Sequence, residues 1–179
     1  MESKISDRLR AARESLFLGV KLSNQGSYAR RAPSPDSLPL FANAREKLEE
    51  VLAEIPTHRE ALMMMAQLSE CLLDYDDAVG LLTRAFDAGE PKSKKSLKRL
   101  ARLRENSHEW QALGLTPDML RRLGDHLDAE GVTPGETTLR HTRDWLVENH
   151  IDDPEAVVAA LERRGAFSDF QVLANVCYG

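Results

Sequence analysis

The sequence predicts an all-α protein, and three features of the chain lead to that prediction. Apolar residues recur at spacings of three and four, as they do along one face of an amphipathic helix. Runs of Val, Ile and Thr with period two, which would predict strands, are missing. Several segments begin with Thr or Asp directly before proline, a combination typical of a helix start. We therefore expect helices throughout, arranged in two parts.

Five helices are predicted in the first part, residues 1–114. Apolar residues on one helical face, Ile5 to Val20, predict a helix over residues 6–24. The next segment, 25–39, is rich in proline and serine and predicts a mobile loop. The remaining helices are expected over residues 40–54, 59–73, 76–88 and 93–106.

Three short helices are predicted in the second part, residues 115–179. The pairs Thr116-Pro117, Thr133-Pro134 and Asp153-Pro154 indicate helices over residues 117–130, 135–149 and 154–164. Residues 168–176 are compatible with a short helix or an extended strand. The charge divides in the same way, because residues 1–112 carry a net charge of +1 and residues 113–179 one of −6. We place the boundary near Gly114.

Composition excludes several classes of protein. The chain has 179 residues, 42% of them apolar, a net charge of −5 and a pI near 5.6. A dedicated nucleic-acid-binding protein would normally be basic. Two distant cysteines, Cys71 and Cys177, give no disulfide framework. The charged amino terminus lacks the pattern of a signal peptide, and no apolar run is as long as a membrane span. We expect a soluble, cytoplasmic protein of bacterial type.

A period of 34 residues relates two of the predicted hairpins. Phe41 and Tyr75 lie 34 residues apart, and the same offset relates Ala44 to Ala78 and Leu48 to Leu82. An aromatic residue followed three positions later by alanine, with proline near the end, resembles the tetratricopeptide repeat. The resemblance implies helical hairpins in which Leu62, Met65, Ala66, Tyr75, Ala78, Leu82 and Ala85 occupy the packing positions.

The repeat pattern extends in both directions. Leu97, Leu100 and Ala101 repeat the first-helix positions, and Trp110 stands where Tyr75 did. Leu18-Gly19 fits the first helix of an earlier repeat. About two and a half tetratricopeptide-like repeats are thus predicted over residues 5–112. Because such repeats cannot bury their faces singly, we expect the second domain to cap the last one through Trp110, Leu113 and the helix from Pro117.

The resemblance to tetratricopeptide repeats implies a groove that binds a peptide or helix. On the repeat register the predicted partner-binding residues are Met63, Met64, Gln67, Lys95, Lys98, Arg99 and Arg102. Met65 is expected in the core, and Met63 and Met64 are equally compatible with core and groove. The basic residues favour an acidic partner, although a solvated helix face explains them as well. A clamp for a terminal carboxylate could use Lys95 and Arg99, but Met64 replaces the asparagine that such clamps require.

We therefore expect a non-enzymatic binding module or adaptor for a protein partner, as a monomer or weak homodimer, without a nucleic-acid or membrane partner. A dedicated inhibitor of one protein, such as an immunity or antitoxin factor, is the alternative within the binding class. A metal-binding or enzymatic second domain is the alternative of another class.

The second part resembles a bacterial family known as domain of unknown function 2695. The matching residues are Leu139-Arg140-His141-Thr142, Trp145-Leu146, Gly165, Asp169, Val172-Leu173 and Asn175-Val176. Ser168, Phe170 and Gln171 replace two cysteines and a glutamate of the family pattern. The resemblance implies a small helical domain, and the substitutions imply that thiol or metal chemistry does not carry over.

Chemical motifs are few. The five histidines show no HExxH spacing, and no nucleophile elbow or phosphate-binding loop is present. The best candidates for an active site are His141, Asp144, Asp169 and Cys177, but they form no known motif. The sequence therefore predicts no catalytic residue, no cofactor and no metal ligand.

Overall fold

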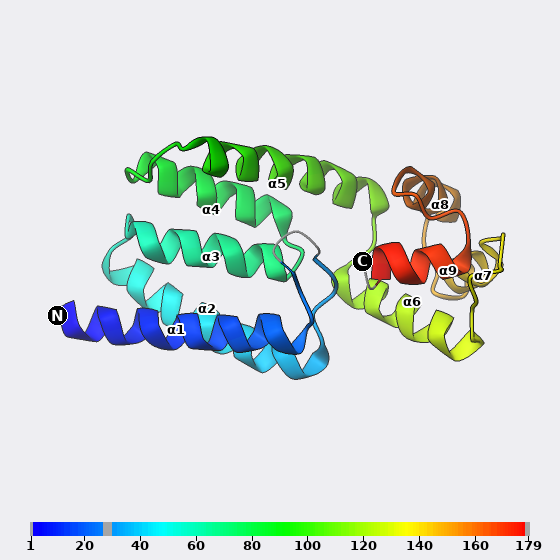
Figure 1. The fold of residues 1–179 in the computed structure, drawn as a ribbon, viewed down its shortest axis with the longest axis horizontal. Coiled ribbons are helices and arrows are strands. Elements are labelled where there is room, and N and C mark those ends of the chain that lie inside the picture. The colour runs from blue at the N-terminus through cyan, green and yellow to red at the C-terminus, as the bar shows by residue number, and fades with distance from the viewer. Residues whose placement is uncertain (1, 27–29, 178–179) are drawn as a thin grey trace. The chain divides into compact units, whose positions relative to one another are not determined.

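The computed structural model describes residues 2–26 and 30–177 (Figure 1). It is all-α, and the described residues contain no strand. The chain divides into two compact units, residues 1–107 and 108–179. The division falls between Ser107 and His108 rather than near Gly114. No helix in the described ranges is long and apolar enough to cross a lipid bilayer.

Two helical hairpins and the first part of a fifth helix build the first unit. α1 (Glu2–Leu22) packs on α2 (Leu38–Glu54), and α3 (Arg59–Cys71) packs on α4 (Tyr75–Asp87). α2 also contacts α3, which joins the hairpins. α5 (Lys94–Leu113) follows, and its residues up to Ser107 belong to this unit. α1, α3 and α5 run in one direction, and α2 and α4 run in the other (Figure 1).

The positions related by the 34-residue period are all buried in the first unit. Phe41 and Tyr75, Ala44 and Ala78, and Leu48 and Leu82 all belong to its core. Small residues let the helices approach closely. At Gly19, for example, a Cβ would lie 2.6 Å from Cε1 of Phe41, so α1 and α2 touch at a point where any larger residue would clash.

α5 departs from the predicted pattern in two ways. It continues through residues 107–113, beyond the predicted end at residue 106, and ends only before Gly114. Leu100 is buried, but Leu97 is 46% exposed and Ala101 is also exposed. The corresponding residues of α3, Leu62 and Ala66, are buried, and α3 packs on the helix that follows it. In the described part of the first unit no helix follows α5, and Leu97 and Ala101 remain accessible.

The second unit has four further helices around a separate core. They are α6 (Pro117–Glu130), α7 (Arg140–Glu148), α8 (Pro154–Arg163) and α9 (Asp169–Val172), which continues into a π-helical turn, Leu173–Cys177. Leu113 is fully buried in this core and Trp110 packs against it. Whether these two residues also cap the repeats stays a prediction. The segment 168–176 is therefore helical, one of its two expected conformations.

The predicted starts of α6 and α8 are correct, and that of α7 is wrong. The Thr116 hydroxyl accepts a hydrogen bond from the Met119 amide at 3.2 Å, and the Asp153 carboxylate accepts one from the Ala156 amide at 3.0 Å. Thr133 and Pro134 instead lie in a turn, and α7 begins only at Arg140. No side chain next to the start of α7 caps it, and its cap comes from Asp169, which is distant in sequence.

The described part of the segment predicted as a mobile loop is anchored. Its residues 27–29 lie outside the described ranges. The buried side-chain amide of Gln25 donates to the carbonyls of Arg31 and Cys71, both at 2.8 Å. The buried hydroxyl of Ser23 donates to that of Ser37 at 2.7 Å. A short 3₁₀ helix, Pro35–Ser37, then leads into α2. These buried hydrogen bonds hold both ends of the segment against the first unit.

Candidate functional site

The candidate site is a surface formed by the three parallel helices α1, α3 and α5. Two sets of ion pairs give their alignment. Arg13 on α1 pairs with Glu60 in the first turn of α3, and Glu70 in the last turn of α3 pairs with Arg99 and Arg102 on α5. These pairs place Arg13 of α1 beside the start of α3 and the first half of α5 beside the end of α3.

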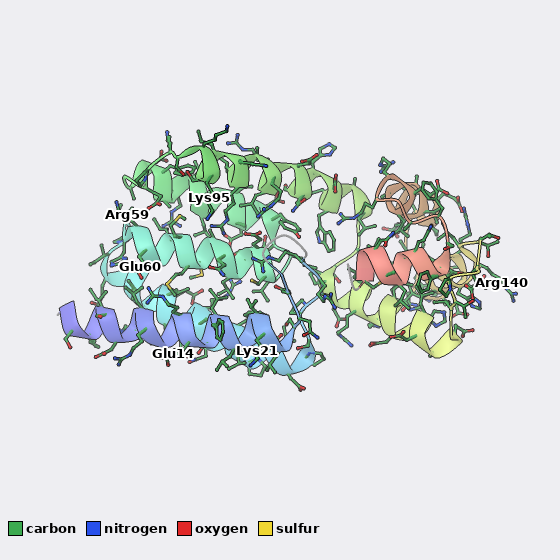
Figure 2. The ribbon with its side chains drawn as sticks, viewed as in Figure 1. Glu14, Lys21, Arg59, Glu60, Lys95 and Arg140 are labelled. Carbon is green, nitrogen blue, oxygen red and sulfur yellow. The ribbon has the colours of Figure 1, made fainter. Side chains whose placement is uncertain are left out.

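On α3 only a narrow stripe remains accessible. Arg59, Glu60 and Gln67 are exposed and Met63 is half-buried, all on one side of the helix. Met64, predicted at the partner surface, is 8% exposed and belongs to the core with Met65. Figure 2 shows Arg59 and Glu60 at the same end of the unit as Lys95 on α5. Of the three consecutive methionines, Met63 alone can offer a substantial part of its side chain to a partner.

α1 contributes an exposed aromatic residue that the sequence analysis did not select. Phe17 is 66% exposed. It follows Arg13 by one helical turn, just as Met63 and Met64 follow Glu60 by about one turn on α3. Glu14 and Lys21, one turn to either side of Phe17, lie along the same exposed side of α1 (Figure 2). Phe17 on α1 and Met63 on α3 thus each follow the Arg13–Glu60 pair by about one helical turn.

The basic residues of α5 fall into two groups. Lys95 and Lys98 are exposed. Arg99 and Arg102 are only partly exposed, and their guanidinium groups bind the carboxylate of Glu70 at 3.0 and 2.9 Å. Two of the predicted partner-binding residues thus hold α5 to α3. A terminal carboxylate bound by Lys95 and Arg99 would have to compete with Glu70 for Arg99. Met64, at the position where such clamps require asparagine, is buried.

Glu70 is the centre of this contact. Its side chain is 2% exposed, and it accepts from Nε and Nη2 of Arg99 and from Nη2 of Arg102. The Nε atom of Arg30, whose side chain is 8% exposed, lies 3.5 Å from the same carboxylate. A buried carboxylate is tolerated only when charges and donors of this kind surround it. The cluster joins α3, α5 and the segment 30–34, and so holds together the helices that carry the exposed side chains of the surface.

We name the exposed side chains of this surface the odd-helix face, after the helices that carry them. They are Arg13, Phe17, Lys21, Glu60, Met63, Gln67, Lys95 and Lys98. Four of the predicted partner-binding residues, Met63, Gln67, Lys95 and Lys98, belong to this face, whereas Arg99 and Arg102 are bound to Glu70 and Met64 is buried. No sequence motif marks Phe17 as a binding residue. Its position alone indicates exposure, because it lies away from the side of α1 that carries the buried residues Ala12, Leu16 and Gly19.

The candidate active-site residues of the second unit are mostly engaged in its structure. Asp169 is fully buried and accepts three hydrogen bonds from His141 and Thr142. Asp144 is exposed and pairs with Arg140 at 3.9 Å. Nδ1 of His141 lies 3.3 Å from a carboxylate oxygen of Glu130, not from Asp144.

Both cysteine thiols are buried, an environment that disfavours the thiolate form. Burial raises the pKa of Cys71 to about 11 and that of Cys177 to about 12. For Cys177 the negative charges of Asp128 and Asp125 raise the pKa further. A nucleophilic cysteine needs the opposite shift, so both residues are neutral thiols at neutral pH.

Comparisons with protein-family models, with curated proteins and with solved structures found no match for this chain.

Proposed function

We propose that this protein is a non-enzymatic, cytoplasmic binding module that holds a segment of a partner protein across the odd-helix face. The observation that carries the proposal is the exposure of Phe17. The ring of Phe17 is 66% exposed beside the exposed charged residues Arg13, Glu14 and Lys21, so an apolar group remains in water. Aromatic residues of this kind are typical anchors of protein interfaces.

The surroundings of Phe17 support a segment with both apolar and acidic side chains as the ligand. Met63 supplies an adaptable apolar neighbour. Lys95 and Lys98 place two positive charges on the far helix of the face, and Lys21 adds a third on α1. An apolar anchor beside such a basic rim suits an amphipathic helix or extended peptide that carries Asp or Glu.

The packing below the face favours binding over a reaction. The close contact of Gly19 with Phe41 holds α1 against α2, the Glu70 cluster holds α5 against α3, and α2 packs on α3. A packed backbone of this kind lowers the ordering cost of binding to that of the exposed side chains. The proposal also follows the likeness of the period-34 pattern to tetratricopeptide repeats, which is an argument by analogy.

Affinity capture with matched variants tests this function. We expect proteins enriched on the wild-type chain to be lost on Phe17→Asp and on Met63→Glu. Phe167→Asp is the control, because Phe167 is 60% exposed but lies in the second unit. If every enriched protein is recovered equally well with the Phe17→Asp/Met63→Glu double variant, the odd-helix face is not the binding surface. Met64→Glu is unsuitable, since Met64 is buried and its substitution would disturb the core.

A further inference from the structure

The second unit brings together three side chains of the kind that hold a transition-metal ion. They are His126 and Glu130 on α6 and His141 in the first turn of α7. One ligand atom from each lies within 4.8 Å of the other two. His126 and Glu130 are four residues apart, so they lie on the same side of α6. From this geometry we propose that His126, Glu130 and His141 bind a divalent transition-metal ion of the zinc class.

The distances fit such an ion. Nδ1 of His141 lies 3.3 Å from Oε2 of Glu130. Zinc bonds to nitrogen and oxygen are about 2.0–2.2 Å long, so two ligand atoms of a tetrahedral site lie about 3.3–3.5 Å apart. The His141–Glu130 separation therefore already matches one edge of the tetrahedron. The ligand atom of His126 lies within 4.8 Å of the other two ligand atoms, so it has to move toward them by no more than ~1.5 Å. Small side-chain rotations within one rotamer can supply this movement.

His126 provides a second, independent indication. Its Nε2 atom is buried and has no hydrogen-bond partner in the described structure. A buried polar atom without a partner is unfavourable by about 1–3 kcal/mol. A metal ion bound at Nε2 would satisfy it. An ion pair between His141 and Glu130 alone would leave it unsatisfied.

The backbone around the site is fixed before any ion binds. The His141 amide donates to Oδ2 of Asp169 at 2.9 Å, and the Thr142 amide and hydroxyl donate to Oδ1 at 2.8 and 2.6 Å. The position of His141 therefore does not depend on the metal. Glu130 and His141 are partly exposed, so an ion and a water molecule as fourth ligand can reach the site from solvent. Residues 113–179 carry a net charge of −6, which attracts cations to this unit.

Bound metal would join the end of α6 to the start of α7 and thereby close the connection formed by residues 131–139. Nitrogen ligands with one carboxylate are compatible with Zn²⁺, Co²⁺ and Ni²⁺ rather than with Ca²⁺ or Mg²⁺, which prefer oxygen ligands. The ion would restrict this connection, and water would occupy the fourth position, as in zinc sites with three protein ligands. The site is independent of the odd-helix face, since it lies wholly in the second unit.

Calorimetric titration of the full-length, tag-free protein with Zn²⁺ tests the site. We expect one ion per chain, with affinity reduced on the order of a hundredfold or more in Glu130→Gln and in His141→Ala, because loss of a mere outer-shell partner already costs ~10–100-fold. Glu130→Gln keeps the size of an exposed side chain, so it tests the ligand without threatening the fold. The exposed His108 lies outside the site, and His108→Ala should bind like the wild type.

A second measurement distinguishes a built site from surface binding. Hydrogen exchange over residues 130–141 should slow when Zn²⁺ is added to the wild type and to His108→Ala, and should not change in Glu130→Gln. Absence of stoichiometric binding, or binding that Glu130→Gln and His141→Ala leave unaltered, would overturn the proposal. Either result would leave the odd-helix face untouched.

Discussion

The two units each bury one carboxylate, and they stabilise it in different ways. Among the described residues, Glu70 is 2% exposed in the first unit and Asp169 is 0% exposed in the second. Glu70 is surrounded by guanidinium groups of Arg30, Arg99 and Arg102. Asp169 instead accepts hydrogen bonds from two backbone amides and one hydroxyl at the start of α7.

The difference lies in what the partners can do when the carboxylate is lost. Arginine side chains are long, and those of Arg99 and Arg102 are already 23% and 27% exposed, so they can turn toward water. The amides of His141 and Thr142 are fixed in the backbone, and Thr142 is fully buried. Donors that cannot reach water keep the whole desolvation penalty. The neutral arrangement should therefore be the more fragile of the two.

Asp169→Ala is expected to have the largest effect. It leaves three donors of α7 without an acceptor and removes the helix cap, so we expect a loss of about 3–5 kcal/mol in the free energy of unfolding of the second unit. Both tryptophans, Trp110 and Trp145, lie in this unit, so urea denaturation followed by tryptophan fluorescence measures it. The control Asp144→Ala removes an exposed carboxylate and should stay within about 0.5 kcal/mol of wild type. Equal effects of the two substitutions would contradict the capping role.

Glu70→Ala should have a smaller effect, although the charge it removes has more cationic partners. We expect a loss of about 3 kcal/mol, the lower end of the range for a broken buried ion pair, because Arg99 and Arg102 can turn toward water whereas Arg30 stays largely buried. Hydrogen exchange should rise at the end of α3 and in the first half of α5, where the cluster joins the helices. Glu60→Ala is the matched control on α3, since its side chain is 47% exposed and an exposed ion pair contributes about 0–1 kcal/mol. A loss larger than that of Asp169→Ala would reverse the comparison.

The smallest effects concern the buried thiols, of which each unit has one. Burial raises the pKa of Cys71 to about 11 and that of Cys177 to about 12, from 9.0. The folded state thus favours the neutral thiol. The resulting stability is fully present below about pH 9 and is lost as the pH rises through the folded pKa values.

At pH 8 the folded protein should therefore react with a thiol reagent more slowly than the urea-unfolded chain, on the order of a hundredfold at Cys71 and a thousandfold at Cys177, because each unit of pKa shift lowers the thiolate fraction about tenfold. In Cys71→Ala the measured rate is that of Cys177, and in Cys177→Ala it is that of Cys71, so the two variants give the rate for each unit separately. A rapid reaction of either thiol in the folded protein would show a more open environment than the structure has.

The parts of the fold that the sequence could predict are those whose signals are local. Thr116 and Asp153 cap the helices that follow them, and the pairs at offset 34 are buried as the repeat register requires. The start of α7 could not be predicted in this way, because its cap, Asp169, lies 28 residues after His141. Thr133-Pro134 has the composition of a cap, but Glu136 accepts the Thr133 amide at 3.2 Å and the segment forms a turn.

The candidate sites show the same limit. The register placed Met63, Gln67, Lys95 and Lys98 on accessible sides of α3 and α5. It could not show that Arg99 and Arg102 are bound by Glu70, because that contact joins residues 29 and 32 positions apart. A glutamate four residues after the packing residue Ala66 was a signal, since a charge at a buried position requires a partner. His141 and Glu130 likewise meet only through the turn that precedes α7.

Site-specific photo-cross-linking tests most directly whether the odd-helix face binds a protein partner. A benzoylphenylalanine at position 17 replaces an exposed phenylalanine, and one at position 167 provides the control, because the two native side chains are 66% and 60% exposed. In cells of the native host we expect position 17 to cross-link to a defined protein, with the product lost when Lys95→Glu and Lys98→Glu are added. Position 167 should not yield that product. Cross-linking of the same proteins from both positions, or none from position 17, would contradict the proposed function.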